Sequence, residues 1–267
     1  MDDCRARLDR FEKLLDALDH ENGLYVKERP YEVLPEFDPN TGWHTIYLRT
    51  KPLDPIFGIL VGEAAHELRA VLDNIAWQLA NLDGPPGQPN KVQFPIMTRE
   101  PKNFAASPYV NGMRPEHVAV LESLQPYVAR KTGQVPLGKG TRLEELAWIN
   151  NTDKHKVVHA TASLAEDVAP SLLHAYQGYR LAGFEFVEGR IVLEGKTYIG
   201  KVCIRPTQPQ LQMHMHGEID VGVAFGDRGS PLFGVPADGG LRLLKQVVEH
   251  IIEALDRPGA SGVPPWP

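Results

Sequence analysis

The pattern of hydrophobic and polar positions divides the chain into a largely helical part and a later part built from short strands. Over residues 3–20 and 56–82, apolar side chains recur every three or four positions, which places them on one face of an amphipathic helix. The second segment is the stronger helix prediction, because its apolar stripe runs unbroken to the helix-breaking sequence Asp83-Gly84-Pro85-Pro86-Gly87. Two long amphipathic helices are therefore expected.

Turn signals occupy the segments around these two helices. Apolar runs at 31–34 and 44–48 flank the turn-rich stretch 38–42, which predicts a β-hairpin at about 31–49. Residues 84–113 are rich in Pro, Asn and Gly and predict a long packed connection. Connections of this length often carry function.

Two further helices are predicted from their start signals. Pro115 is suited to the first turn of a short helix that runs through Leu124, and residues 125–127 close it. A capping box at residues 141–144 begins a helix that the spacing extends to about Ala162.

The period changes to two in the later part of the chain. Short apolar runs predict strands at 179–181, 184–186, 191–193 and 198–204, and residues 211–223 alternate as an amphipathic strand. Helical spacing returns over residues 241–255.

The predicted fold class is α+β. A helical, bundle-like region that includes the small hairpin covers residues 1–165. An antiparallel β-sheet and a C-terminal helix cover 171–257 and pack on the first region as one unit, followed by a loose tail at 258–267.

Composition and charge restrict the protein classes that fit this fold. The chain has 267 residues, of which 28 are basic and 34 acidic, so the net charge of −6 weakly repels a phosphate backbone. It contains no apolar stretch approaching about 18 residues and no secretory signal, which predicts a cytoplasmic protein without a membrane partner. Its two cysteines, Cys4 and Cys203, are expected to be free thiols, and no cofactor is expected.

The predicted helix over 56–82 carries a polar face beside its apolar stripe. Residues three and four apart are neighbours on a helix surface, so the face gathers His66, Arg69, Asp73, Asn74 and Trp77. One interpretation is an exposed face with an Arg69–Asp73 ion pair, and the other is a binding or catalytic surface.

The predicted helix from residue 141 has polar residues where its apolar stripe should continue, namely Asn150, Asn151 and Lys154. A buried polar group without a partner costs about 1–3 kcal/mol, so we expect these side chains to meet the polar face of the 56–82 helix. Asp153 and His155 belong to the same dense polar run. The run is either a hydrogen-bond network between helices or part of a site.

The segment Arg69-Ala70-Val71-Leu72-Asp73-Asn74 resembles the motif of HEPN (higher eukaryote and prokaryote nucleotide-binding) domains, in which a histidine follows an arginine after four to six spacer residues. The whole chain resembles uncharacterised bacterial proteins that pair such a helix with an Asn-rich, Asp-Lys-His run like residues 150–155. HEPN domains are helical bundles, and many are dimeric RNA-cleaving toxins or defence proteins.

The resemblance implies that Arg69 polarises a scissile phosphate and that Asn74 occupies the position of the general base. Asn74 stands where the motif has histidine, and Ala70 replaces a common polar residue. An amide cannot take up a proton at neutral pH, so the base would be His66 or His155.

Two other patterns have a simpler explanation than a site. His214 and His216 share one side of the predicted strand with Glu218, as in a cupin-like metal site, but a solvated sheet face also explains this alternation. Residues 133–141 resemble a phosphate loop, yet Gly140 stands where Ser or Thr should hold magnesium.

Three functional hypotheses follow from the sequence. The first is a HEPN-like, RNA-directed or defence-related protein with a degenerate motif, acting as a homodimer. The second is a small-molecule binding protein or enzyme with a pocket at the 56–82/141–162 helix pair. The third is a structural or interaction protein whose polar helix network only specifies packing.

Overall fold

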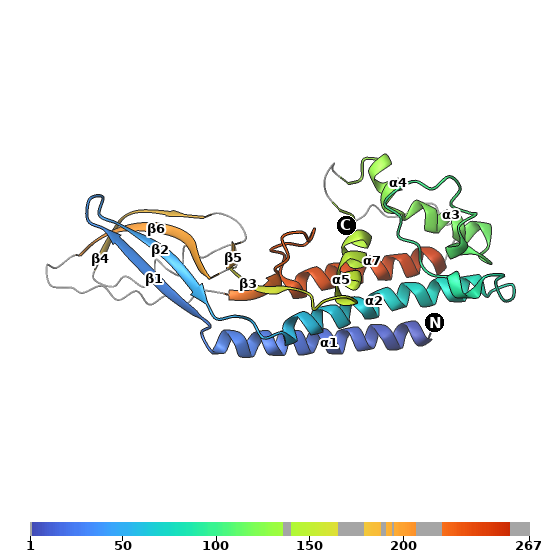
Figure 1. Cartoon of the computed structure of the whole chain (residues 1–267), viewed down its shortest axis with the longest axis horizontal. Helices are drawn as coiled ribbons and strands as arrows, with labels where there is room; N and C mark the ends of the chain where they lie inside the picture. The colour runs from blue at the N-terminus through green and yellow to red at the C-terminus, as the bar shows by residue number, and fades with distance from the viewer. Residues whose placement is uncertain are drawn as a thin grey trace.

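The computed structural model describes residues 2–135, 140–164, 179–187, 191–193, 195–206 and 221–256. The fold is α+β, as the sequence predicted, and it is elongated (Figure 1). Helices α1, α2 and α7 run along the long axis. A four-stranded sheet lies at one end of them and the short helices α3 and α4 lie at the other.

Three long helices build the main core. Helix α2 (Ile56–Ala80) packs along α1 (Asp2–Lys27) on one side and against α7 (Ala237–Asp256) on another. Helix α5 (Arg142–Asp153) lies across this group and also contacts α2. Because neighbours cover α2 on several sides, most of its apolar residues are buried. The largest fully buried side chains of this core include Phe11, Leu15, Leu68, Leu72 and Phe94.

Proline begins each short element of the distal end. The connection after α2 contains the 3-10 turns η1 (Pro89–Lys91) and η2 (Pro108–Val110), followed by α3 (Pro115–Ser123) and α4 (Pro126–Lys131). Proline fits the first helical turn because the amide proton it lacks would have no partner within the helix there. The short helix beginning at Pro115 is confirmed, whereas α4 was not predicted.

The β-hairpin is confirmed, and it belongs to a larger sheet. Strands β1 (Tyr31–Asp38) and β2 (Trp43–Thr50) pair antiparallel, and β2 also pairs with β6 (Lys196–Pro206), which pairs with β4 (Tyr179–Phe186). Buried side chains from β2 and β6 form a second core beneath this sheet, including Ile46, Leu48, Ile199 and Val202.

A second, three-stranded sheet joins this assembly to the helices. It has the order β5 (Ile191–Leu193), β3 (Ala160–Leu164) and β7 (Val221–Phe225), and it is antiparallel throughout. The predicted strands at 179–181 and 184–186 are parts of one strand, β4, which has a register shift between Leu181 and Gly183.

The helix predicted to run from residue 141 to about Ala162 is too long. Helix α5 begins at the predicted capping box, where Thr141 accepts from the Glu144 amide and Glu144 accepts from the Thr141 amide, but it ends at Asp153. Residues 160–164 form strand β3 instead, because strands pair with it on both sides. These pairings outweigh the helical spacing of the segment.

Some predictions lie outside the described residues. These are the first part of the alternating strand at 211–223, with His214 and His216, and the tail at 258–267. Within the described ranges, no helix combines the length and apolar character needed to cross a bilayer.

Candidate functional site

The polar faces of α2 and α5 meet at one of the three expected side chains, Asn150, whereas Asn151 and Lys154 are exposed. His66 Nδ1 lies 3.1 Å from Asn150 Oδ1, a distance that fits a protonated Nδ1 donating to the amide oxygen. Asn150 is only 3% exposed, so this hydrogen bond supplies the partner that its buried amide requires. His66 itself remains exposed at the helix surface.

Two glycines of α2 allow the end of α5 and the following segment to approach closely. A Cβ added at Gly62 would lie 1.9 Å from Asp153 Oδ1, and one added at Gly58 would lie 2.1 Å from the Val158 carbonyl oxygen. The backbone of α2 therefore contacts both groups directly. Asp153 therefore lies against α2. That it belongs to a binding site stays a prediction.

Arg69 and Asp73 form a clamp on the long connection after α2. The Arg69 guanidinium donates to both carboxylate oxygens of Asp73, at 3.1 and 2.8 Å, and to the Phe94 carbonyl at 2.7 Å. Asp73 also accepts from the Phe94 amide at 2.9 Å. The predicted ion pair is confirmed, and its contacts with Phe94 favour a structural role for Arg69, whose side chain is 13% exposed.

The same connection is held from its other side by Gln125, which the sequence analysis did not single out. Gln125 is fully buried and accepts from the Met97 amide at 2.9 Å. Its side-chain nitrogen donates to the Pro95 carbonyl at 3.0 Å and to the Leu121 carbonyl at 2.8 Å. The spacing of apolar residues does not single out Gln125, because its hydrogen bonds go to backbone groups about 30 positions away in the sequence.

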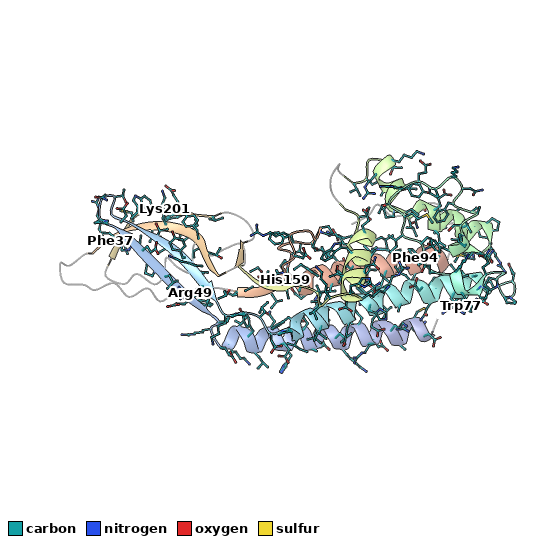
Figure 2. The ribbon with its side chains drawn as sticks, in the orientation of Figure 1. Phe37, Arg49, Trp77, Phe94, His159 and Lys201 are labelled. Atoms are coloured by element: carbon teal, nitrogen blue, oxygen red, sulfur yellow. The ribbon has the colours of Figure 1, made fainter. Side chains whose placement is uncertain are left out.

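The other predicted site residues do not gather around His66 and Asn150. Asn151, Lys154 and His155 are exposed near the end of α5, and Asn74 is half-buried on α2. Trp77 is 44% exposed near the C-terminal end of α2, well away from the sheets (Figure 2). Within the described ranges, no three His, Cys, Asp or Glu side chains are grouped so that they could hold a metal ion.

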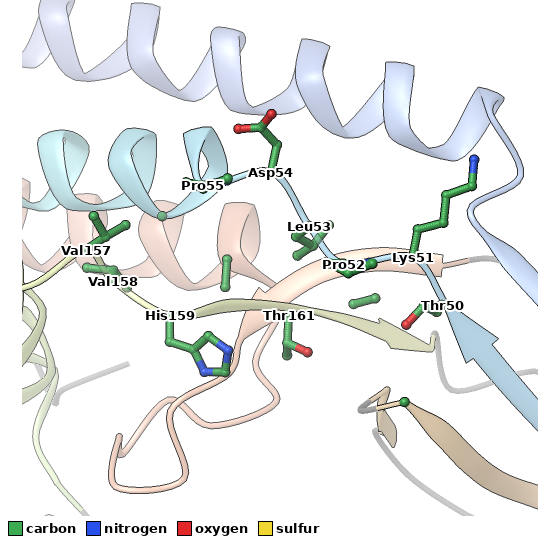
Figure 3. A pocket seen from close by; sticks show the side chains of 14 residues that line it. Thr50, Lys51, Pro52, Leu53, Asp54, Pro55, Val157, Val158, His159 and Thr161 are labelled. Carbon is green, nitrogen blue, oxygen red and sulfur yellow. The ribbon is translucent and has the colours of Figure 1, made fainter.

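A cleft of about 630 Å³ opens where the helices meet the two sheets (Figure 3). One wall is the segment from the end of β2 to the start of α2, and the other is the segment that enters β3. Leu53 points from the first wall toward β3, whereas His159 and Thr161 both point to the side of β3 that faces away from this wall. The lining residues are Thr50–Pro55, Gly58, Val157–Ala162 and Gly195.

Gly226, which follows β7, makes room for the side chains of His159 and Thr161. A Cβ at Gly226 would lie 2.9 Å from His159 Nδ1 and 2.9 Å from Thr161 Cβ, so both side chains rest against its backbone. The Gly226 amide also donates to the His159 carbonyl at 2.8 Å. The sequence pattern placed His159 in the polar run of a helix, so its position beside the cleft was not predicted.

An anionic group lies beside His159. Asp227 accepts from the Gly229 amide at 2.9 Å and from the Lys156 ammonium at 3.1 Å. These two hydrogen bonds, the backbone one first, lower the pKa of Asp227. The carboxylate is therefore ionised at neutral pH.

The fold and site together define an α+β protein with a cleft at the junction of its helices and sheets. Comparisons with protein-family models, curated proteins and solved structures find no match for the chain. The HEPN resemblance therefore stays a prediction.

Proposed function

We propose that the protein binds a small organic molecule in the cleft between its helices and sheets. The cleft itself is the observation that carries the proposal. Its volume of about 630 Å³ lies in the range of ligand sites, and such sites are concave, mostly apolar and contain a few convergent polar groups. Among its lining residues only Gly58 belongs to α2 and none belongs to α5, so the cleft lies beyond the helix pair at which the sequence analysis expected a pocket.

The lining indicates the chemistry of the ligand. Leu53, Ala160 and Ala162 offer apolar contact to a compact hydrocarbon body. His159 is also in the lining, and its exposed imidazole offers a hydrogen bond. A ligand with an apolar body and one polar group fits this division.

A thermal-shift screen with carboxylates, alcohols and amides of one or two rings tests the proposal. A ligand at 100 times its Kd adds about 2.7 kcal/mol of stability, which raises the Tm by roughly 5–10 °C for a chain of this size. We expect Ala160→Phe to fill the cleft and abolish the shift, and His159→Ala to reduce it. His155→Ala, an exposed change outside the cleft, serves as the matched control.

A shift that persists in Ala160→Phe would contradict the cleft as the binding site. A screen without any stabilising compound would contradict the proposal and favour the structural or interaction role.

An RNA-directed function, in the manner of the HEPN resemblance, is the second candidate. It is favoured by the exposed imidazole of His66, which lies one turn before Arg69 on α2 and is oriented by Asn150. His66 would serve as the base that Asn74 cannot provide. In this function the protein would act as a homodimer, and light scattering would measure its mass.

Cleavage of single-stranded RNA by the purified chain tests this candidate. Loss of a general base lowers the rate by about 10²–10⁴-fold, so His66→Ala should show this loss, whereas His20→Ala on the exposed side of α1 should not. Arg69→Ala is a poor probe, because Arg69 also holds Phe94. RNA that stays intact with the unaltered chain would refute the nuclease form.

A further inference from the structure

Strand β3 has one backbone edge that its partner strand covers only in part. Strand β7 pairs with β3 along its whole length, from Ala160 to Leu164, whereas β5 pairs with the opposite edge only from Ala162 onward. A longer β5 in the same register would place Gly195 opposite Ala160. The chain instead turns toward β6 at Gly195, where φ is +63°. In the part of the chain that the structure describes, no strand therefore covers this edge at Ala160.

The hydrogen bonds of Phe225 show which way the backbone groups of Ala160 point. Phe225 lies opposite Ala160 in β7. Its amide donates to the Val235 carbonyl at 3.1 Å, and its carbonyl accepts from the Gly234 amide at 2.8 Å, so both groups face away from β3. The N–H and C=O of Ala160 therefore point away from β7, toward the uncovered edge. Neither group has a hydrogen-bond partner among the described residues.

The uncovered edge borders the cleft. Ala160 and Gly195, which would pair if β5 continued, both line it. Successive side chains of a strand point to opposite faces. His159 and Thr161 point away from the first wall (Figure 3), so the methyl group of Ala160 points toward it. A molecule at this edge can therefore pair with Ala160 and contact Leu53 at the same time.

The two free groups of Ala160 define the chemistry that pairs with them. In an antiparallel ladder, the N–H and C=O of one residue pair with the C=O and N–H of one partner residue. A ligand that does the same carries two amide groups on either side of one tetrahedral carbon, as in an N-acylated amino acid amide. Directly opposite residues have their side chains on the same face, so the ligand's side chain lies toward Leu53 and Ala162. An apolar side chain suits these neighbours.

The ends of the uncovered edge set the length of the ligand. On one side, β5 begins to pair at Ala162. On the other side, the Val158 carbonyl oxygen packs against α2, where it lies 2.1 Å from a Cβ added at Gly58. One residue with its two amide groups extends over roughly 7 Å. The cleft, with a volume of about 630 Å³, has room for a molecule of this size.

We propose that the ligand of the cleft is an N-acylated amino acid amide with an apolar side chain, which adds to the edge of β3 as a short strand. Its N–H donates to the Ala160 carbonyl, and its C=O accepts from the Ala160 amide. Strand addition of this kind is a recurring mode of peptide recognition. The inference rests on the proposed function of the cleft and names the class of ligand.

NMR titration of the full chain with N-acetyl-L-leucinamide tests the proposal. The comparison compound is its ester analogue, in which an oxygen atom replaces the acetylated nitrogen. We expect the amide to bind about tenfold more tightly, because the ester lacks the donor and sets an oxygen against the Ala160 carbonyl. The amide should also shift the Ala160 N–H resonance and slow its exchange with solvent. Equal affinities, no binding of the amide, or an unchanged Ala160 resonance would overturn the proposal.

Proline at position 160 tests the Ala160 N–H directly. Proline is tolerated in a strand where the N–H has no ladder partner, so Ala160→Pro should keep its Tm and bind the amide at least tenfold more weakly. Ala162→Pro is the matched change on the edge that β5 covers, and it should lower the Tm by roughly 5–10 °C. An equal loss of Tm in both variants would show that the Ala160 N–H has a partner, and would overturn the proposal.

The failure of this inference is distinguishable from the failure of the proposed function. If the amide fails but other compounds in the thermal-shift screen bind, and Ala160→Phe abolishes their shift, the cleft remains a ligand site of another class. If no compound binds, both proposals are wrong.

Discussion

Replacing Arg69 with methionine should lower the free energy of unfolding by about 2–3 kcal/mol. Methionine keeps much of the apolar stem but removes the guanidinium. The Phe94 carbonyl then loses the Arg69 donor, and the Asp73 carboxylate keeps only its hydrogen bond from the Phe94 amide. The estimate lies below the cost of breaking a fully buried pair, because Asp73 is 38% exposed and water can solvate it. Urea unfolding followed by circular dichroism measures the change.

Arg49→Met is the control for this change. Arg49 pairs with Glu32 on the four-stranded sheet, with side chains 57% and 61% exposed, so its loss should cost less than about 0.5–1 kcal/mol. If Arg69→Met were no more destabilising than Arg49→Met, Arg69 would have no structural role. Loss of RNA cleavage without loss of stability would then assign it to the second candidate function.

Local signals in the sequence predicted the individual elements well. The spacing of apolar residues gave α2 to within two residues at its C-terminal end, and the turn at 38–42 gave the hairpin. The capping box at Thr141 marked the start of α5, which begins at Arg142. These features depend on neighbours within a few positions, which is why a single sequence reveals them.

Pairing between distant segments could not be predicted in this way. Strand β2 pairs with β6, about 150 residues later, and nothing in the spacing of either strand specifies the other. The same limitation produced the error at the end of α5. Residues 157–162 have apolar positions compatible with either a helix or a strand, and only the partners β5 and β7 decide the outcome.

One part of the candidate site could be predicted from the sequence and another part could not. The contact between His66 and Asn150 could be predicted, because a polar residue at core spacing requires a partner and the other polar helix was the evident source. The cleft could not, because its two walls lie about 100 residues apart in the chain. The position of His159 beside the cleft follows only when residues 160–164 are recognised as a strand.

The close approach of Gly58 to Val158 gives the second large prediction. Alanine at position 58 would place its Cβ 2.1 Å from the Val158 carbonyl oxygen, a backbone atom that cannot rotate away. We expect Gly58→Ala to lower the free energy of unfolding by about 2–3 kcal/mol, as overpacking does in a tight core. This loss outweighs the gain of about 0.5–1 kcal/mol that alanine brings to a helix.

Gly23→Ala separates these two opposing effects. Gly23 lies in α1 with no atom within 4 Å of an added Cβ, so alanine there should raise the free energy of unfolding by about 0.5–1 kcal/mol. Opposite signs for the two substitutions in urea unfolding would show that α2 and the segment entering β3 are in direct backbone contact. Stabilisation by both would mean that the Val158 backbone moves aside readily. Because Gly58 and Val158 both line the cleft, that result would also indicate that its walls are not fixed, so a ligand would have to order them when it binds.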